Sequence, residues 1–158
     1  MSLHNQEVGF MGQDKARQYL EEKDYSIVAE NFRCRLGEID LIATRDNVLV
    51  FLEVKTDLTG FFGEAEARVD LRKQRRIKRA ALFFLAENKF HYHRDWEYRF
   101  DVIVIEKETS LDHKNHINHK KHKNHKNLRD SSDERNTSFQ LNKLKQMNLN
   151  LRHIQNAF

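Results

Sequence analysis

The stretch GEIDLIATRDNVLVFLEVKT, residues 37–56, predicts a β-hairpin. Two apolar runs of strand length flank a candidate two-residue turn at Asp46-Asn47. Such a turn fixes which residues of the two strands lie opposite each other. In this register Asp40 is expected to face Glu53 across the hairpin.

The charged end of this hairpin is difficult to explain as scaffold alone. Directly opposed Cβ atoms lie about 4.5–5.5 Å apart, so the carboxylates of Asp40 and Glu53 repel unless a cation or a shared proton lies between them. Oxygen ligands favour a hard divalent ion, Mg²⁺ or Mn²⁺. The same register places Glu38 opposite Lys55, with Lys55 beside the ion. The alternative is a solvated strand end in which Glu38 and Lys55 form a surface ion pair.

Three blocks of this sequence resemble a known family. They are GEIDLIA, VFLEVK and RFDVIVI, which begin at residues 37, 50 and 99. In this order and spacing they resemble the YraN-like family of small bacterial proteins, over about residues 9–105. Asp40 followed by Glu-Val-Lys at 53–55 also resembles the D…(D/E)xK signature of the restriction-endonuclease-like, or PD-(D/E)XK, nucleases. Archaeal Holliday-junction resolvases are similar to this family.

The resemblance implies an endonuclease that hydrolyses DNA phosphodiester bonds with Mg²⁺ or Mn²⁺, in DNA repair or recombination on branched DNA. The implied catalytic residues are Asp40, Glu53 and Lys55, with Glu38 assisting as an outer base. Asp40 and Glu53 are the implied metal ligands, together with the main-chain carbonyl of Val54.

Two positions depart from the pattern of the family. Gln13 stands where a glutamate is usual, and a neutral amide brings no charge to a metal site. Asp57 stands where arginine is common, which removes a candidate phosphate contact. Gln13 and Asp101 are candidates for shaping the site from behind the metal ligands. For Asp101 the favoured interpretation is a structural ion pair with a nearby arginine.

Residues 70–88 predict a helix with Asp70 as its N-cap and an apolar stripe at helical spacing. Six basic side chains lie within residues 72–79 without acidic partners at i+4, so they repel one another. Bound phosphates would relieve this repulsion, whereas the alternative is an ordinary solvated helix face. The candidate nucleic-acid contacts are Arg72, Lys73, Arg75, Arg76 and Arg79.

The whole pattern predicts an α/β protein. Helices are expected over residues 5–22 and 70–88, and strands over residues 25–33, 39–43, 48–54 and 96–105. The second helix is expected to cross over to the last strand, which gives a mixed central sheet flanked by helices. This order is the αβββαβ core of the restriction-endonuclease-like fold, with residues 1–107 as the nuclease domain.

Residues 108–158 differ in composition from this domain. They hold 10 basic and 5 acidic residues, whereas residues 1–107 hold 18 basic and 19 acidic residues. The net charge of +4 therefore belongs to the tail and does not argue that the domain binds nucleic acid. Histidine at every third position from His113 to His125, among Lys and Asn, predicts a disordered C-terminal tail. Apolar residues after Ser138 are compatible with a short terminal helix.

Composition also restricts the cellular context. No stretch approaches the roughly 18 apolar residues of a membrane span, so no membrane contact is expected. The N-terminal residues lack an apolar signal core. The single cysteine, Cys34, has no partner for a disulfide within the chain, as is usual in a reducing compartment. We therefore expect a cytoplasmic protein.

Three functions are compatible with the sequence. The first is a metal-dependent DNA nuclease, for which a homodimer would suit the cleavage of two strands. The second is a catalytically impaired nucleic-acid-binding protein of the same fold. The third is a protein-interaction module that uses the basic helix or the tail.

Overall fold

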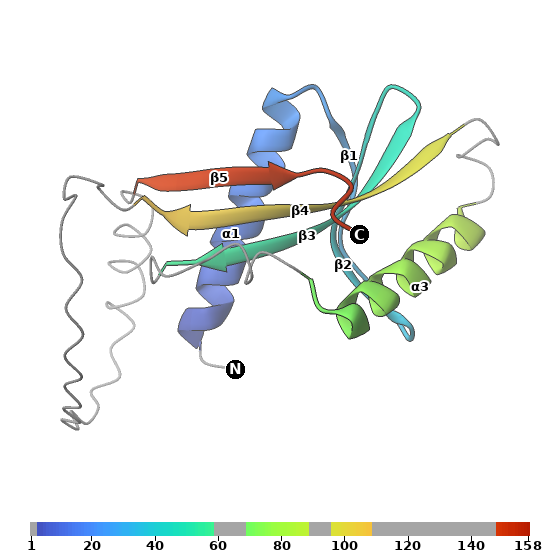
Figure 1. Ribbon diagram of the computed structural model, residues 1–158, viewed down its shortest axis with the longest axis horizontal. Coiled ribbons are helices and arrows are strands. Elements are labelled where there is room, and N and C mark those ends of the chain that lie inside the picture. The colour runs from blue at the N-terminus through green and yellow to red at the C-terminus, as the bar shows by residue number, and fades with distance from the viewer. Residues whose placement is uncertain (1–2, 59–68, 89–95, 109–147) are drawn as a thin grey trace.

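The computed structural model describes residues 3–58, 69–88, 96–108 and 148–158 (Figure 1). Its elements are α1 (Leu3–Glu22), β1 (Ser26–Cys34), β2 (Gly37–Arg45), β3 (Val48–Asp57), α3 (Leu71–Glu87), β4 (Glu97–Lys107) and β5 (Leu149–Ile154). The predicted α/β class, with helices against a mixed sheet, is confirmed.

The five strands form one sheet in the order β1-β2-β3-β4-β5. Neighbouring strands are antiparallel except β3 and β4, which are parallel (Figure 1). A parallel pair needs a connection that returns to the same end of the sheet. The segment that contains α3 makes this connection, as the sequence predicted.

The hairpin of β2 and β3 has the predicted turn, and the predicted register in the half next to the turn. Asp46 adopts a left-handed φ of 55°, which aspartate tolerates better than most residues. Leu41 pairs with Leu52, and Ala43 pairs with Val50. The middle of β3 is buried on both faces because it is the central strand.

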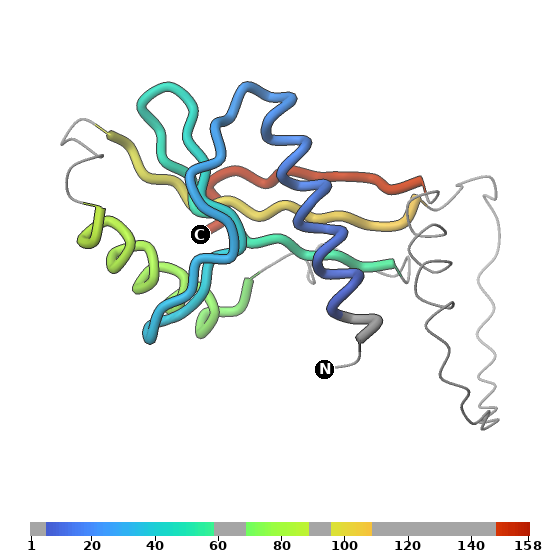
Figure 2. Tube along the Cα trace, turned by 180° about the vertical axis from the view of Figure 1, so that it is seen from behind, coloured from blue at the N-terminus to red at the C-terminus, as the bar shows by residue number. Residues whose placement is uncertain are grey.

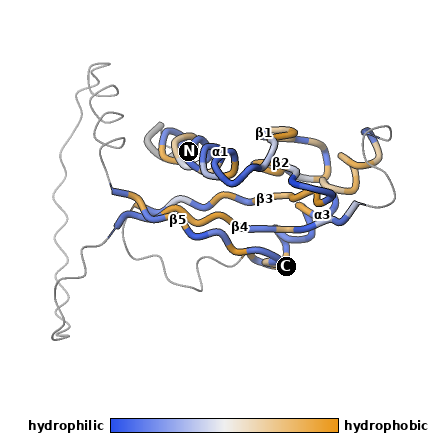
Figure 3. Tube along the Cα trace, turned by 90° about the horizontal axis from the view of Figure 1, so that it is seen from above, coloured by the Kyte–Doolittle hydropathy of each residue, from blue (hydrophilic) through white to orange (hydrophobic). Residues whose placement is uncertain are grey.

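The two helices pack against the sheet through separate apolar clusters. In Figure 2, α1 runs across β3, β4 and β5, whereas α3 lies beside the hairpin of β1 and β2. Figure 3 shows α1 as a layer over strands rich in hydrophobic residues. The α1 cluster includes Ala16, Leu20, Leu41, Leu52 and Ile103. The α3 cluster includes Ile77, Ala81, Phe84, Phe51 and Val102.

Small residues allow both helices to approach the sheet closely. Gly12 of α1 faces Thr56, and a Cβ at Gly12 would overlap the Thr56 side chain. Ala16, one turn later, is fully buried. Gly37 of β2 allows α3 to approach in the same way, because a Cβ there would lie 2.6 Å from the Arg76 carbonyl oxygen.

The chain after residue 147 differs from the prediction. Residues Leu149–Ile154 form β5, antiparallel to β4, so the possible terminal helix is wrong here. The local spacing of apolar residues permitted both helix and strand. Pairing with β4, whose residues 102–105 are buried, decides for the strand. The sheet therefore extends beyond the expected boundary at residue 107. Residues 109–147, with the histidine-rich tract, lie outside the described residues.

Asp101 ties β5 to the sheet through a buried polar network. Its carboxylate accepts hydrogen bonds from Arg99 Nε at 2.9 Å, His153 Nε2 at 2.8 Å and the Asn156 N–H at 3.0 Å. Arg99 also donates to the Tyr25 hydroxyl at 2.8 Å. Burial alone would raise the pKa of Asp101, but these hydrogen bonds outweigh it and hold the pKa below its ordinary value. Asp101 thus has the arginine partner that the sequence favoured.

The substitution Asp101→Asn should destabilise the protein by on the order of 3 kcal/mol, because it leaves Arg99 and His153 around a neutral group. Urea denaturation measures the change. The matched control is Asp46→Asn on the exposed hairpin turn, which should change stability by less than about 0.5 kcal/mol. Equal stabilities of the two variants would contradict the anchoring role of Asp101.

Candidate functional site

The ladder between β2 and β3 ends at Leu41 and Leu52, before the charged end of the hairpin. Beyond this point a side chain replaces the main chain as acceptor, because Asp40 Oδ2 accepts the Val54 N–H at 2.8 Å. The sequence predicted that Asp40 and Glu53 form a pair in this ladder, and the structure shows that they do not. They lie instead at a fork where the two strands separate.

β2 stays paired with β1 where it leaves β3, because Ile39, Glu38 and Gly37 pair with β1 and not with β3. Asn31 of β1, with a left-handed φ of 50°, lies between the pairs Glu30–Leu41 and Phe32–Ile39 of this ladder. Ile39 belongs to the α3 cluster and Leu41 to the α1 cluster, although residues two apart in a regular strand lie on the same face. The predicted opposition of Glu38 and Lys55 is wrong as well, because the ladder between β2 and β3 ends at Leu41 and Leu52.

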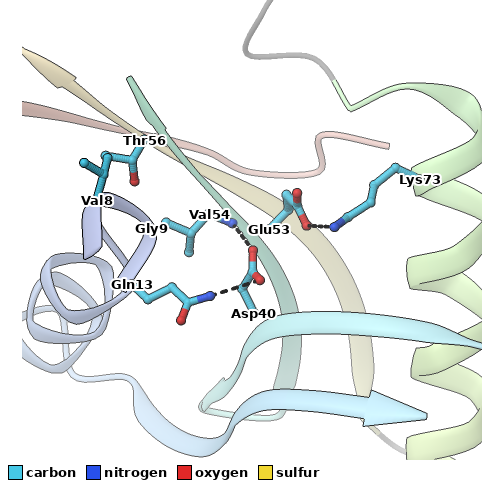
Figure 4. Close-up of a pocket in the computed structure, with 8 residues that line it drawn as sticks. All are labelled: Val8, Gly9, Gln13, Asp40, Glu53, Val54, Thr56 and Lys73. Carbon is cyan, nitrogen blue, oxygen red and sulfur yellow. Dashed lines mark hydrogen bonds and ion pairs between the residues drawn. The ribbon is translucent and has the colours of Figure 1, made fainter. Parts of the chain in front are cut away.

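A cavity of about 300 Å³ opens at this fork (Figure 4). It lies between α1 and the first turn of α3, and four elements contribute to its wall. The lining residues are Val8, Gly9, Gln13, Asp40, Glu53, Val54, Thr56 and Lys73. The fold thus brings together residues that are up to 65 positions apart in the sequence.

Gln13 of α1 reaches Asp40 directly. Its Nε2 donates to Asp40 Oδ1 at 3.1 Å, while Oδ2 accepts the Val54 N–H (Figure 4). Both oxygens of Asp40 are therefore oriented by the protein. The close approach of α1 at Gly12 places Gln13 at this position.

Lys73 lies in the cavity and not on the outer face of α3. Its Nζ lies 3.3 Å from Glu53 Oε2 and 3.2 Å from Glu38 Oε1. The sequence had grouped Lys73 with the phosphate-contact residues of this helix. Its inward position could have been read from the apolar stripe, because Ile77 follows one turn later and is buried. Val8, Gly9 and Thr56 carried no comparable signal, since they line the wall without ionisable groups.

Burial dominates the electrostatics of the two carboxyls. It raises the pKa of Glu53 to about 7, and the neighbouring Asp40 adds to the rise. Burial also raises the pKa of Asp40, although the hydrogen bond from Val54 acts in the opposite direction. For Lys73, burial disfavours the ammonium, but Glu53, Asp40 and Glu38 outweigh it and raise the pKa. The cavity is therefore a place where negative charge is costly and a cation is favoured.

The remaining candidates lie at or beyond the margin of the cavity. Lys55 follows Glu53 by two residues on β3, and burial lowers its pKa, against the attraction of Glu53 and Asp70. Glu38 contacts the cavity through Lys73. Asp101 belongs to the β5 network and does not line the cavity.

The first turn of α3 is fixed by its N-cap, as the sequence predicted. Asp70 Oδ1 accepts the N–H groups of Arg72 and Lys73 at 2.8 and 3.0 Å. Apart from Lys73, the predicted phosphate-contact residues of this helix are exposed. They are Arg72, Arg75, Arg76 and Arg79. A row of guanidinium groups thus begins beside the cavity and follows α3 away from it.

Comparison with known proteins identifies the family. The model of a family described as "Uncharacterised protein family UPF0102" matches residues 12–105. The chain belongs to the UPF0102 family. It is 41% identical to a UPF0102 protein of Alkaliphilus oremlandii over 112 residues, which covers 69% of this chain and 95% of the relative. It is 43% identical to one of Geobacter metallireducens over 116 residues, covering 73% and 93%.

These UPF0102 matches confirm the YraN-like resemblance and name no activity. The family match covers both halves of the fork and the whole of α3. No helix in the described part of the chain is long and apolar enough to cross a membrane.

The donors in the cavity suit a hard cation. Within the described ranges, no group of three or more His, Cys, Asp or Glu residues forms a metal cluster. Side-chain oxygens in the cavity wall come from the carboxylates of Asp40 and Glu53, the Gln13 amide and the Thr56 hydroxyl, and Val54, whose carbonyl is the predicted main-chain ligand, also lines it. Glu53 Oε2 is buried and lacks a hydrogen bond, although it lies near the Lys73 ammonium. An oxygen-only set with one buried, unsatisfied carboxylate oxygen fits Mg²⁺ or Mn²⁺ better than a softer metal.

The pKa of Glu53 predicts that stability falls as the pH rises. This pKa is about 7 in the folded protein and 4.5 ordinarily, so between these pH values only the folded form keeps the proton. The free energy of unfolding should decline by on the order of 3 kcal/mol across this window and level off above it. Glu53→Gln cannot ionise and should remove most of the decline, while Asp40, whose pKa burial also raises, keeps the remainder. Urea denaturation without divalent ions measures both profiles.

Glu97→Gln is the matched control, because Glu97 is an exposed residue of β4. It should keep the wild-type pH dependence. If the free energy of unfolding changes with pH in the same way in wild type and in Glu53→Gln, the Glu53 carboxyl ionises normally and the prediction is wrong.

Proposed function

We propose that this protein is a Mg²⁺- or Mn²⁺-dependent endonuclease that hydrolyses phosphodiester bonds in DNA. The observation that carries the proposal is the fork, which places the carboxylates of Asp40 and Glu53 in one cavity beside a lysine. The resemblance to the D…(D/E)xK nucleases supports the same assignment. DNA repair or recombination on branched DNA in the cytoplasm is the proposed setting.

Each residue has a role that its position supports. Asp40, Glu53 and the Val54 carbonyl would hold the metal, which when bound polarises a phosphate and activates a water. The Val54 N–H and Gln13 orient Asp40 for this task. Lys55 would orient the attacking water or stabilise charge on the phosphate, and burial already lowers its pKa.

The exposed arginines of α3 support a nucleic acid as substrate. A row of cations that begins beside the cavity can contact successive phosphates while one phosphate reaches the carboxylates. Glu38, which contacts Lys73 at the margin, would assist as an outer base. We also propose that two copies act together, because each cavity would cut one strand.

The experiment is a cleavage screen of duplex, single-stranded, flapped and branched DNA with Mg²⁺ or Mn²⁺. Asp40→Ala and Glu53→Ala should each lower the cleavage rate about 100-fold or more, because each removes a charged group at the reacting centre. Asp46→Ala, an exposed carboxylate on the same hairpin, is the control and should keep the wild-type rate. The proposal fails if no substrate is cut, or if Asp40→Ala cuts as fast as wild type.

A second candidate function is binding of DNA without cleavage. It is favoured by Gln13, whose amide occupies Asp40 Oδ1 without adding the negative charge that strengthens a divalent metal site. Asp57, at the end of β3, adds an anion on the strand that carries Lys55. In this case the arginines of α3 would still attract DNA.

Charge reversal on α3 measures its contribution to binding. Changing Arg75, Arg76 and Arg79 together to Glu should weaken DNA binding by 100-fold or more at low salt. It should also lower the slope of log affinity against log salt by about 2 to 3, because three phosphate contacts are lost. Fluorescence anisotropy with labelled DNA and EDTA gives both values. The control reverses three lysines off this helix, Lys15, Lys23 and Lys107. If both triple variants lose the same DNA affinity, α3 contributes only general electrostatic attraction and no specific contacts.

A further inference from the structure

Lys73 differs from the other cations of α3 in where its charge lies. Its side chain is 26% exposed, and its ammonium lies 3.3 Å from Glu53 Oε2 and 3.2 Å from Glu38 Oε1. The main chain of Lys73 is held in place by the N-cap, because Asp70 accepts the Lys73 N–H. Figure 4 shows the Lys73 chain extending from α3 to Glu53 across the edge of the cavity. Lys73 is therefore held toward the carboxylates before any substrate arrives.

The contact with Glu53 is an incomplete one. Glu53 Oε2 is buried and has no hydrogen bond, so the ammonium supplies charge without good hydrogen-bond geometry. A divalent ion offers the same oxygen twice the charge and direct coordination. A divalent ion and Lys73 thus compete for one carboxylate oxygen.

Glu38 is a second partner of Lys73, and this contact can persist when a divalent ion displaces Lys73 from Glu53. The Glu38 side chain is 44% exposed and lies outside the cavity lining, so it can hold the ammonium while Glu53 binds a metal. An ammonium released from Glu53 but held by Glu38 remains at the margin of the cavity. A phosphate oxygen that approaches the metal would meet this cation.

We propose that Lys73 occupies Glu53 in the metal-free protein and, when a divalent ion takes Glu53, forms a phosphate-binding position at the edge of the cavity. The inference rests on the proposed function, since it requires the metal at Asp40 and Glu53. It assigns Lys73 a role different from that of Arg75, Arg76 and Arg79. Those residues attract DNA with or without metal, whereas Lys73 binds phosphate only after metal binding.

The first measurement is a Mn²⁺ titration by calorimetry of wild type, Lys73→Met and Lys78→Met. Lys78 is the matched control: it is a lysine of the same helix whose Nζ lies over the Phe100 ring, away from the carboxylates. Lys73→Met should bind Mn²⁺ about tenfold more tightly than wild type, because a competing charge is gone. Lys78→Met should match wild type. Lys73→Gln, which is polar but also lacks the competing charge, replaces Lys73→Met if that variant does not fold.

The second measurement is the gain in DNA affinity on adding Ca²⁺, another hard cation that oxygen ligands bind. A labelled duplex and anisotropy are used with and without the ion. Wild type and Lys78→Met should show the same gain, and Lys73→Met should lose most of it. A structural role for Lys73 alone would leave the gain unchanged.

The outcomes separate this inference from the proposed function. Unchanged or weaker Mn²⁺ binding by Lys73→Met, with normal binding by wild type, overturns the inference alone. Tighter Mn²⁺ binding with an undiminished gain in DNA affinity also overturns it. Absence of Mn²⁺ binding in wild type and Lys73→Met, both without and with bound DNA, overturns both, because neither Lys73 nor a missing phosphate then conceals a metal site. Binding by Lys73→Met but not by wild type supports the inference.

Discussion

The hydrogen bond from the Val54 N–H to the Asp40 carboxylate is the interaction on which the site depends. A continued hairpin ladder would have satisfied this N–H with a main-chain carbonyl. The side chain takes that place at 2.8 Å, so the strands can separate without leaving a buried donor unpaired. The separation opens the cavity and turns Asp40 toward it. Gly12 and Gly37 then let α1 and α3 close in on either side of the fork.

The site concentrates charges that do not stabilise the fold. Glu53 is buried and Asp40 is partly buried beside it, and burial raises the pKa of both carboxyls. The Lys73 ammonium is the cation among the lining residues that offsets them, and it leaves Glu53 Oε2 without a hydrogen bond. The Val54 N–H and the Gln13 amide also favour the Asp40 carboxylate. By contrast Asp101, a fully buried carboxylate, has its oxygens engaged by Arg99, His153 and the Asn156 N–H, and its pKa is lowered. Unsatisfied, mutually repelling groups in a cavity are typical of a functional site, and the satisfied network of Asp101 is typical of a structural one.

Much of the fold could be predicted because its determinants are local. The turn at Asp46, the alternation along β2 and β3 and the N-cap of α3 all depend on neighbouring residues. The fork could not be predicted, because it depends on where the ladder of β2 and β3 ends and on the Asp40 side chain accepting the Val54 N–H. The strand β5 could not be predicted either, because its spacing allowed a helix and only pairing with β4 decides. For the site, the residue types at positions 40 and 53 were sufficient to find the carboxylates. The apolar stripe of α3 also indicated that Lys73 faces inward, but the basic residues around it suggested an exposed position.

The most direct test of the central claim is to locate Mn²⁺ in crystals of the protein grown with a DNA oligonucleotide, by anomalous scattering. The presence of DNA covers the case in which a substrate phosphate completes the site. The fork predicts a peak within coordination distance of Asp40, Glu53 and the Val54 carbonyl, which is lost in Asp40→Ala. Absence of a peak between these residues, with DNA seated in the cavity, would contradict a metal-dependent site at the fork.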